Sequence, residues 1–87
     1  MFTLNYKDET RGFHIEFSNG WNVSVQWGRG TYSENYNSTT GGPSATAEVW
    51  SWNEETKERY PESPEAYQTP EEVARFISIV SQKDFAP

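Results

Sequence analysis

The sequence predicts an α+β domain in which an antiparallel sheet of four to five strands carries one C-terminal helix packed on one face. Apolar and polar residues alternate over 13–17 and again over 21–27, which is typical of a hairpin with one buried face. A helix-start signal at Thr69 precedes an amphipathic stripe. That helix is the only cover available for the apolar face of the sheet. A length of 87 residues fits a single domain, 1–87.

A first strand is predicted near the N-terminus, where Phe2, Leu4 and Tyr6 alternate with polar residues. The polar run 7–12 then serves as the loop before the hairpin. With a loop of this length, we expect the first strand to pair with the second as Tyr6 opposite Phe13, Leu4 opposite Ile15 and Phe2 opposite Phe17.

The hairpin at 13–27 has a turn whose length decides which residues face each other. A two-residue loop at Asn19 and Gly20 would put apolar residues opposite polar ones along the whole ladder. A three-residue loop, 18–20, with Gly20 in the left-handed conformation gives one apolar face instead. We therefore expect the pairs Phe17 with Trp21, Ile15 with Val23, and Phe13 with Val25.

Residues 28–44 are predicted to form a long loop. Gly, Ser, Asn and Thr dominate this stretch, periodicity is absent, and seventeen residues is long for a connection in so small a domain. The half that holds Arg29, Tyr32 and Tyr36 has the composition of an ordered functional loop. The half from 37 to 44 has that of a spacer.

A fourth strand is predicted over 45–52, with Ala47, Val49 and Ser51 on one face and Trp50 and Trp52 on the other. A four-residue turn at 53–56 would pair Trp52 with Lys57, Trp50 with Arg59 and Val49 with Tyr60. Basic side chains facing tryptophans favour cation-π stacking on that face. Two prolines, Pro61 and Pro64, are expected to end the fifth strand and leave 62–68 irregular.

The C-terminal helix is predicted over 69–83. Thr69 is the expected N-cap, Pro70 takes the first helical position and Glu72 the third, which together form a capping box. The apolar stripe follows at helical spacing, with Val73, Phe76, Ile77 and Val80.

Charge and composition argue against some classes of binding partner. The net charge is -6, and residues 48–72 account for all of it, with eight Glu against two bases. The seven Lys and Arg residues form no basic stripe, which argues against a nucleic-acid polymer as partner. No cysteine, apolar span or signal segment is present, so we expect a soluble cytoplasmic protein with no membrane partner. The acidic region is either a solvated edge or a surface that imitates a nucleic-acid backbone and blocks a basic groove.

The sequence predicts no enzyme. A cysteine-histidine pair is impossible without cysteine, and a Ser-His-Asp arrangement would have to use His14, the only histidine, on the polar face of a strand. Paired acids such as those at 54–55 and 71–72 have structural explanations in a turn and at a helix start. We therefore expect no catalytic residue, cofactor or metal.

Two groups of residues are candidates for binding. In the first, Gly28 and Gly30 flank Arg29, as in an anion-binding nest, and the guanidinium could close on a phosphate or carboxylate. Trp27, Tyr32 and Tyr36 would then offer rings for stacking. An ordinary loop exit has the same glycine pattern. The second group would meet a protein partner and consists of Trp50, Trp52, Glu54, Glu55, Glu58 and Arg59.

The stretch GFHIEFSNGWNVSVQWGRGTY at 12–32, with the charged second half and the helix start TPEEV, is similar to small proteins of unknown function from tailed bacteriophages. This resemblance covers about the first 36 residues plus the helix start. It implies an accessory protein that acts in the cytoplasm of the infected bacterial host cell. That class includes inhibitors of host defence such as anti-CRISPR proteins, and sponges that sequester nucleotide signals.

Three functions are therefore open. The first is a phage-encoded, anti-CRISPR-like inhibitor that occupies a host defence protein. The second is sequestration of a small nucleotide at the 27–36 loop. The third is a small structural or assembly module whose fourteen aromatic residues, four Trp, five Tyr and five Phe, serve only packing. A homodimer through the exposed tryptophan strand is compatible with either binding function.

Overall fold

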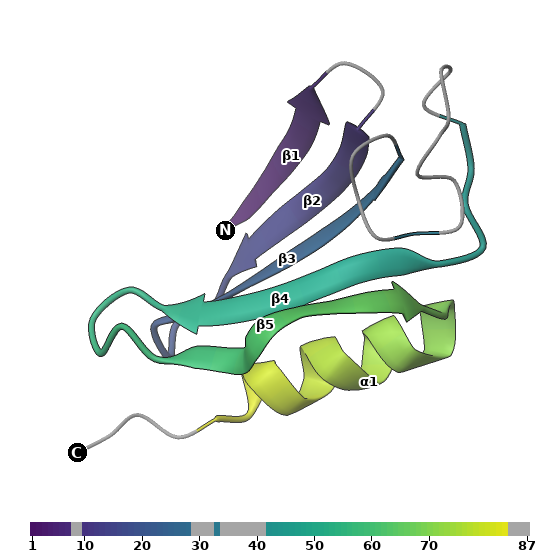
Figure 1. Cartoon of the computed structure of the whole chain (residues 1–87). Coiled ribbons are helices and arrows are strands. Elements are labelled where there is room, and N and C mark those ends of the chain that lie inside the picture. Colours follow the sequence, from purple (N-terminus) through teal and green to yellow (C-terminus); the bar gives the residue numbers. More distant parts are fainter. Residues whose placement is uncertain (8–9, 29–32, 34–41, 84–87) are drawn as a thin grey trace.

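The structure is a computed structural model that describes residues 1–7, 10–28, 33 and 42–83. Five strands form one antiparallel sheet in chain order, and the helix packs on one of its faces (Figure 1). This confirms the predicted α+β fold class. The elements are β1 (Phe2–Lys7), β2 (Thr10–Glu16), β3 (Trp21–Gly28), β4 (Ala47–Asn53), β5 (Arg59–Gln68) and α1 (Pro70–Ser81).

The β2–β3 hairpin has the predicted register. Phe13 lies opposite Val25 and Ile15 opposite Val23. The backbone N–H of Phe17 donates to the carbonyl of Trp21 at 2.9 Å, which leaves a three-residue loop. Gly20 has a φ of +86°, the left-handed conformation expected for a bulge at this position.

The predicted register of β1 was wrong by two residues. Leu4 lies opposite Phe13 and Phe2 opposite Ile15, because β2 already begins at Thr10 and pairs there with Lys7. The run 7–12 looked like a loop because it is polar, but most of it is strand. A shift of two residues keeps every side chain on its original face of the sheet, so the apolar face survives the correction.

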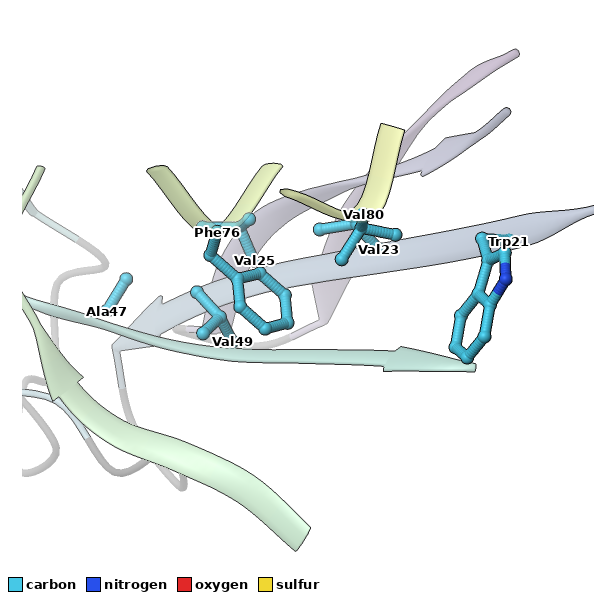
Figure 2. Close-up of a cluster of buried hydrophobic side chains, with 7 residues drawn as sticks. All are labelled: Trp21, Val23, Val25, Ala47, Val49, Phe76 and Val80. Atoms are coloured by element: carbon cyan, nitrogen blue, oxygen red, sulfur yellow. The ribbon is translucent and has the colours of Figure 1, made fainter. Parts of the chain in front are cut away.

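The hydrophobic core lies between α1 and the strands β3 and β4. Phe76 and Val80 come from the helix and lie over valines of the sheet (Figure 2). These contacts confirm the alternation predicted for β3 and β4 and the apolar stripe of the helix. The buried cluster consists of Trp21, Val23, Val25, Ala47, Val49, Phe76 and Val80, with Phe13, Phe17, Trp27, Val73 and Ile77 packed against it.

The loop between β4 and β5 lies one residue later than predicted, so the pairing of the two strands is shifted by two residues. Trp52 lies opposite Arg59 instead of Lys57. The Asn53 side chain sets this register, since its Oδ1 accepts hydrogen bonds from the backbone N–H groups of Glu55 at 2.9 Å and Thr56 at 3.1 Å. Asn53 itself therefore belongs to the ladder, and the loop runs over 54–57, with Lys57 at a φ of +65°.

Strand β5 continues beyond the prolines that were expected to end it. Ser51 pairs with Tyr60, and Val49 pairs with Glu65. A step of two residues along β4 therefore corresponds to a step of five residues along β5. The prolines lie in the interval where the ladder is interrupted, because they have no N–H to donate. As an edge strand, β5 tolerates this interruption. The irregular segment predicted at 62–68 is therefore wrong. The predicted pairing of Val49 with Tyr60 is also wrong, because the displaced turn shifts the pairing of β4 with β5 by two residues and Tyr60 pairs with Ser51.

The helix has the predicted capping box. The Thr69 hydroxyl accepts from the N–H of Glu72 at 3.3 Å, and a Glu72 carboxylate oxygen accepts from the N–H of Thr69 at 2.9 Å. The helix ends at Ser81, short of the predicted end at residue 83. Within the described part of the chain, no helix is long and apolar enough to cross a membrane.

The capping box makes a pH-dependent contribution to stability. Hydrogen bonds from the backbone and side chain of Thr69 lower the pKa of the Glu72 carboxyl, with a smaller effect of Arg75. A lowered folded-state pKa gives stability that is present above the unfolded pKa, about 4.3, and is lost as pH falls through the folded value. We expect Glu72→Gln to lower the Tm slightly at neutral pH, and the difference from wild type to vanish in acid.

The control for this prediction is Glu71→Gln, which removes the same charge from the first helical turn at a residue that makes no capping-box bond. In Glu72→Gln the amide oxygen can still accept from the N–H of Thr69, but without the charge that strengthens this bond. Thermal unfolding followed by circular dichroism across the acid range measures both variants. An equal effect of the two substitutions at every pH would show that the hydrogen bonds of Glu72 contribute nothing beyond its charge.

Candidate functional site

The broad face of the sheet opposite α1, hereafter the open face, carries the candidate site. Trp50 and Trp52 lie on it because they alternate along β4 with Val49 and Ser51, which are buried beneath the helix. A groove of about 440 Å³ runs beside the two indoles. It is lined by Ser24, Gln26, Glu48, Val49, Trp50, Trp52, Asn53, Glu54, Lys57, Arg59 and Pro64.

The two indoles are held in place by hydrogen bonds. Trp50 Nε1 donates to the carbonyl of Pro61 at 2.7 Å, and Trp52 Nε1 donates to a carboxylate oxygen of Glu54 at 2.9 Å. The ring centroids lie 5.9 Å apart with planes inclined at 46°. Since both indole N–H groups are already used, a ligand would meet ring faces and edges, which favours apolar or cationic groups.

Arg59 forms one wall of the groove. Its guanidinium carbon lies 5.6 Å from the centroid of the Trp50 ring. The predicted cation-π contact between these two residues is therefore confirmed, although Arg59 lies opposite Trp52 in the ladder and reaches Trp50 diagonally. This contact fixes the arginine stem beside the ring, so less side-chain entropy remains to be lost on binding.

A polar pair from β2 and β3, the half-buried His14 and the buried Asn22, lies next to Trp52. The His14 ring lies 5.1 Å from the Trp52 ring, and its Nε2 is 2.9 Å from the Oδ1 of Asn22. Asn22 is only 2% exposed, and its Nδ2 has no hydrogen-bond partner among the residues that the structure describes. His14 and Asn22 are thus polar neighbours of the Trp52 ring on this face, and Asn22 lies opposite Trp52 in the ladder.

Acidic residues surround one end of the groove. The turn after β4 exposes Glu54, Glu55 and Glu58 to solvent, with Lys57 among them. Three acids against one base give this turn a net charge of -2. Within the groove itself two acids, Glu48 and Glu54, lie on the same lining as two bases. The groove is therefore nearly neutral, and its rim toward the turn is negative.

The structure brings together some of the predicted binding residues and separates others. Trp50, Trp52, Glu54 and Arg59 line one groove, and Glu55 and Glu58 lie in the adjoining turn. Trp27 lies on the opposite face, half-buried against the core beside α1, where it lines a different groove with Val73 and Ile77. Three predicted residues, Arg29, Tyr32 and Tyr36, lie outside the described residues.

Several groove residues were missed by the sequence reasoning. Ser24 and Gln26 come from β3, where they pair with Trp50 and Glu48 across the ladder. Their place on the polar face of β3 was predictable from alternation, but their position beside the tryptophans depends on the pairing of β3 with β4. The missed lining residues are Ser24, Gln26, Glu48, Val49, Asn53, Lys57 and Pro64.

The groove has the chemistry of a recognition surface. It offers two aromatic rings and one arginine held against a ring, residue types that are enriched at protein–protein interfaces, together with polar and charged side chains. Over residues 1–7, 10–28, 33 and 42–83, no three His, Asp or Glu side chains gather in a way that would hold a metal ion.

Three comparisons with known proteins, covering family models, curated proteins and solved structures, find no match to this chain. The class that the fold and the groove define is a small α+β domain with one covered and one open sheet face.

Proposed function

We propose that this chain is a non-enzymatic binding protein that occupies a protein partner through the groove on its open face. The observation that carries the proposal is the convergence of Trp50, Trp52 and Arg59 beside an acidic turn, on the sheet face that α1 leaves uncovered. Trp and Arg are the residues most often found to dominate the binding energy of interfaces.

The charges suggest which kind of partner the groove would take. An acidic partner would meet the negative rim at Glu54, Glu55 and Glu58, and like charges across an interface cost binding energy. A basic segment would be attracted to that rim, and an apolar side chain within it would fit against the indole faces. We therefore propose a partner segment with one apolar anchor flanked by Lys or Arg.

A role in inhibiting host defence is supported only by the resemblance to phage proteins. It stays a prediction, as does an anti-CRISPR role. Blocking a nucleic-acid-binding groove of a host protein would agree with the proposed partner, because such grooves are lined by Lys and Arg.

Charge reversal of the acidic turn tests the proposal. Binding of fluorescent peptides with an apolar anchor and either basic or acidic flanks is measured by anisotropy at several salt concentrations. We expect wild type to prefer the basic peptides, with affinity that falls as salt rises. The triple variant Glu54→Lys, Glu55→Lys, Glu58→Lys should bind them at least about tenfold more weakly, a loss of about 1.4 kcal/mol.

The matched control reverses three exposed glutamates elsewhere, with Glu62→Lys, Glu65→Lys and Glu71→Lys, and so gives the same net charge. It should keep most of the affinity, because local charges at the groove matter more than distant screened ones. If both triple variants lose the same affinity, the effect comes from overall charge. That result would contradict a defined binding site at the groove. A preference for the acidic peptides would contradict the proposed partner chemistry.

Sequestration of a small nucleotide at the 27–36 loop is the second candidate. Its supporting pattern is the nest sequence around Arg29, which lies outside the described residues. This function predicts that one class among mono-, di- and cyclic oligonucleotides raises the Tm of the chain by mass action. Arg29→Ala should abolish that shift while leaving the Tm of the free protein nearly unchanged. Retention of the shift in the variant would exclude Arg29 as the phosphate-binding residue.

A further inference from the structure

Among the residues that the structure describes, no strand pairs with the outer edge of β1. The sheet runs in the order β1 to β5, so β1 and β5 are its two edges (Figure 1). Met1 and Glu16 exchange both backbone hydrogen bonds, each at 2.7 Å. In an antiparallel ladder such pairs alternate with non-bonded ones, so the N–H and C=O groups of Phe2, Leu4 and Tyr6 point away from β2.

The same strand presents apolar side chains that the helix does not reach. Phe2 is 78% exposed and Leu4 is 73% exposed. They lie opposite Ile15 and Phe13, and so on the face of the sheet that carries α1, but the helix packs on β3, β4 and β5. Figure 1 shows β1 and β2 extending beyond the helix. Large exposed side chains beside an unpaired edge are the combination that natural sheets usually avoid.

The opposite edge is protected in the usual ways. Strand β5 contains Pro61 and Pro64, has interrupted pairing with β4, and exposes Glu62 and Glu65. Prolines, bulges and charges each prevent a further strand from adding to an edge. The six residues of β1 contain no proline and no acid, and their only charged residue is Lys7.

We propose that two copies of this chain pair through β1 in a two-fold antiparallel arrangement centred on Leu4. This register places Leu4 opposite Leu4 of the second copy and Phe2 opposite Tyr6. It uses the outward N–H and C=O groups of all three residues. The apolar face then continues across the two-fold axis, and the dimer ends on both sides in the protected β5 edges, so the assembly closes.

Charge and size agree with a second copy as the occupant. The net charge of -6 lies in residues 48–72, on β4, the turn after it, β5 and the start of α1, whereas β1 contains no acidic residue. Two acidic chains therefore meet where repulsion is smallest. A six-residue strand is about 20 Å long. Pairing along this length buries an area near the lower limit of about 1,000 Å² for specific interfaces, which predicts a reversible dimer of micromolar or weaker affinity.

Cysteine cross-linking tests the register directly, because the chain has no cysteine of its own. In the proposed dimer the two Cα atoms at position 4 are about 5.5 Å apart, within the range of about 4.4–6.8 Å for a disulfide. Leu4→Cys should form a covalent dimer rapidly under mild oxidation. The control Phe2→Cys places its two Cα atoms about 13 Å apart, four residues along the strand, and should cross-link much more slowly.

A charge-swap experiment tests the same contact without a covalent bond. Sedimentation velocity of the untagged chain from micromolar to submillimolar concentration should show a monomer–dimer equilibrium. Leu4→Lys and Leu4→Glu should each be monomeric, because like charges would face each other across the axis. An equimolar mixture of the two should regain the dimer. Since Leu4 is exposed, neither change should prevent folding, and circular dichroism verifies this.

Three results would overturn the proposal. A wild-type chain that sediments as a monomer at every concentration would exclude the dimer, and would leave this edge to a strand from another protein. Cross-linking at position 2 that equals or exceeds that at position 4 would exclude the register. A dimer that persists in both Leu4 variants would place the interface elsewhere. None of these results bears on peptide binding at the groove of the open face.

Discussion

Asn19→Asp is expected to destabilise the fold by about 3 kcal/mol or more at neutral pH, and to do more damage than Asn19→Ala. The side chain of Asn19 is 6% exposed and lies in the turn between β2 and β3. It joins this turn to the end of α1, 61 to 64 residues later in the chain. The substitution changes one side-chain N–H₂ group into an oxygen, with almost no change in volume.

The hydrogen bonds of Asn19 explain the expected loss. Its Nδ2 donates to the carbonyls of Val80 and Lys83, both at 3.0 Å, and lies 3.4 Å from that of Ser81. The carbonyls of Val80 and Ser81 belong to the negative end of the helix dipole. A carboxylate at this position would present an oxygen to them and could donate nothing. Its other oxygen would keep the bond from the N–H of Trp21 at 3.0 Å.

Asn19→Ala provides the comparison. It removes the donor and the acceptor together, leaves buried polar groups without a partner, and should cost about 1–3 kcal/mol. Water can enter part of the space and satisfy some of these groups. Asn19→Asp should be worse, because it adds an unpaired buried charge to the same losses.

Urea unfolding of wild type and both variants over a range of pH measures the difference. Burial and the nearby carbonyls would raise the folded-state pKa of a carboxyl at position 19 above its unfolded value of about 3.9. The protonated form is therefore favoured in the fold, so the stability that is present below the unfolded pKa is lost as pH rises through the folded pKa. The variant should approach wild type in acid and fall behind it at neutral pH. An Asp variant as stable as the Ala variant at neutral pH would contradict this account of the turn.

Sequence reasoning identified the elements whose signals are local. Alternation alone placed Val23, Val25 and Val49 beneath the helix, and the capping box located the start of α1 at Pro70. The three-residue loop before Trp21 followed from the need for one apolar face. Each of these signals lies within a few residues of the structure it specifies.

The register of the two outer strands was missed because it depends on interactions that composition does not reveal. A polar run with a glycine predicts a loop, but Thr10 to Gly12 join β2. Prolines predict the end of a strand, but an edge strand can continue through them. In the β4–β5 turn, the side chain of Asn53 replaces backbone partners and moves the loop by one residue.

The candidate site was found in part for the same reason. Trp50 and Trp52 were assigned to one face by alternation, and Arg59 was expected to stack on a tryptophan. The support from His14 and Asn22 was missed, because it requires the order of three neighbouring strands in the sheet. Trp27 was grouped with a loop site, but its own alternation with Val25 places it beside the helix.

Gly12→Ala is expected to destabilise the fold by about 3 kcal/mol or more, although it adds only one methyl group. A Cβ on Gly12 would lie 2.0 Å from the carbonyl oxygen of Val25 and 2.9 Å from the Cα of Gln26. Both atoms belong to the backbone of β3, the strand that carries the core valines. A flexible side chain could rotate away from such a clash, but a paired strand in the middle of a sheet cannot.

Gly20→Ala is the matched comparison for the same added methyl group. Its φ of +86° is unfavourable for alanine, but the nearest atom to the new Cβ is Nδ2 of the Asn53 side chain, at 3.3 Å. We expect a loss of about 1 kcal/mol from the backbone conformation. Thermal unfolding of the two variants should therefore separate strain at a turn from a clash between strands.

Gly12→Ala should also disturb the structure of the open face. Strand β2 carries His14 two residues further on, and His14 supports the Trp52 ring together with Asn22 of β3. If β2 and β3 are forced apart, that support moves and the groove beside the indoles changes shape. Peptide binding should therefore weaken in Gly12→Ala even where the chain is still folded. If Gly12→Ala has the same stability and peptide affinity as Gly20→Ala, the backbone of β3 must move at Val25 and relieve the clash. That result would contradict a rigid pairing of β2 with β3.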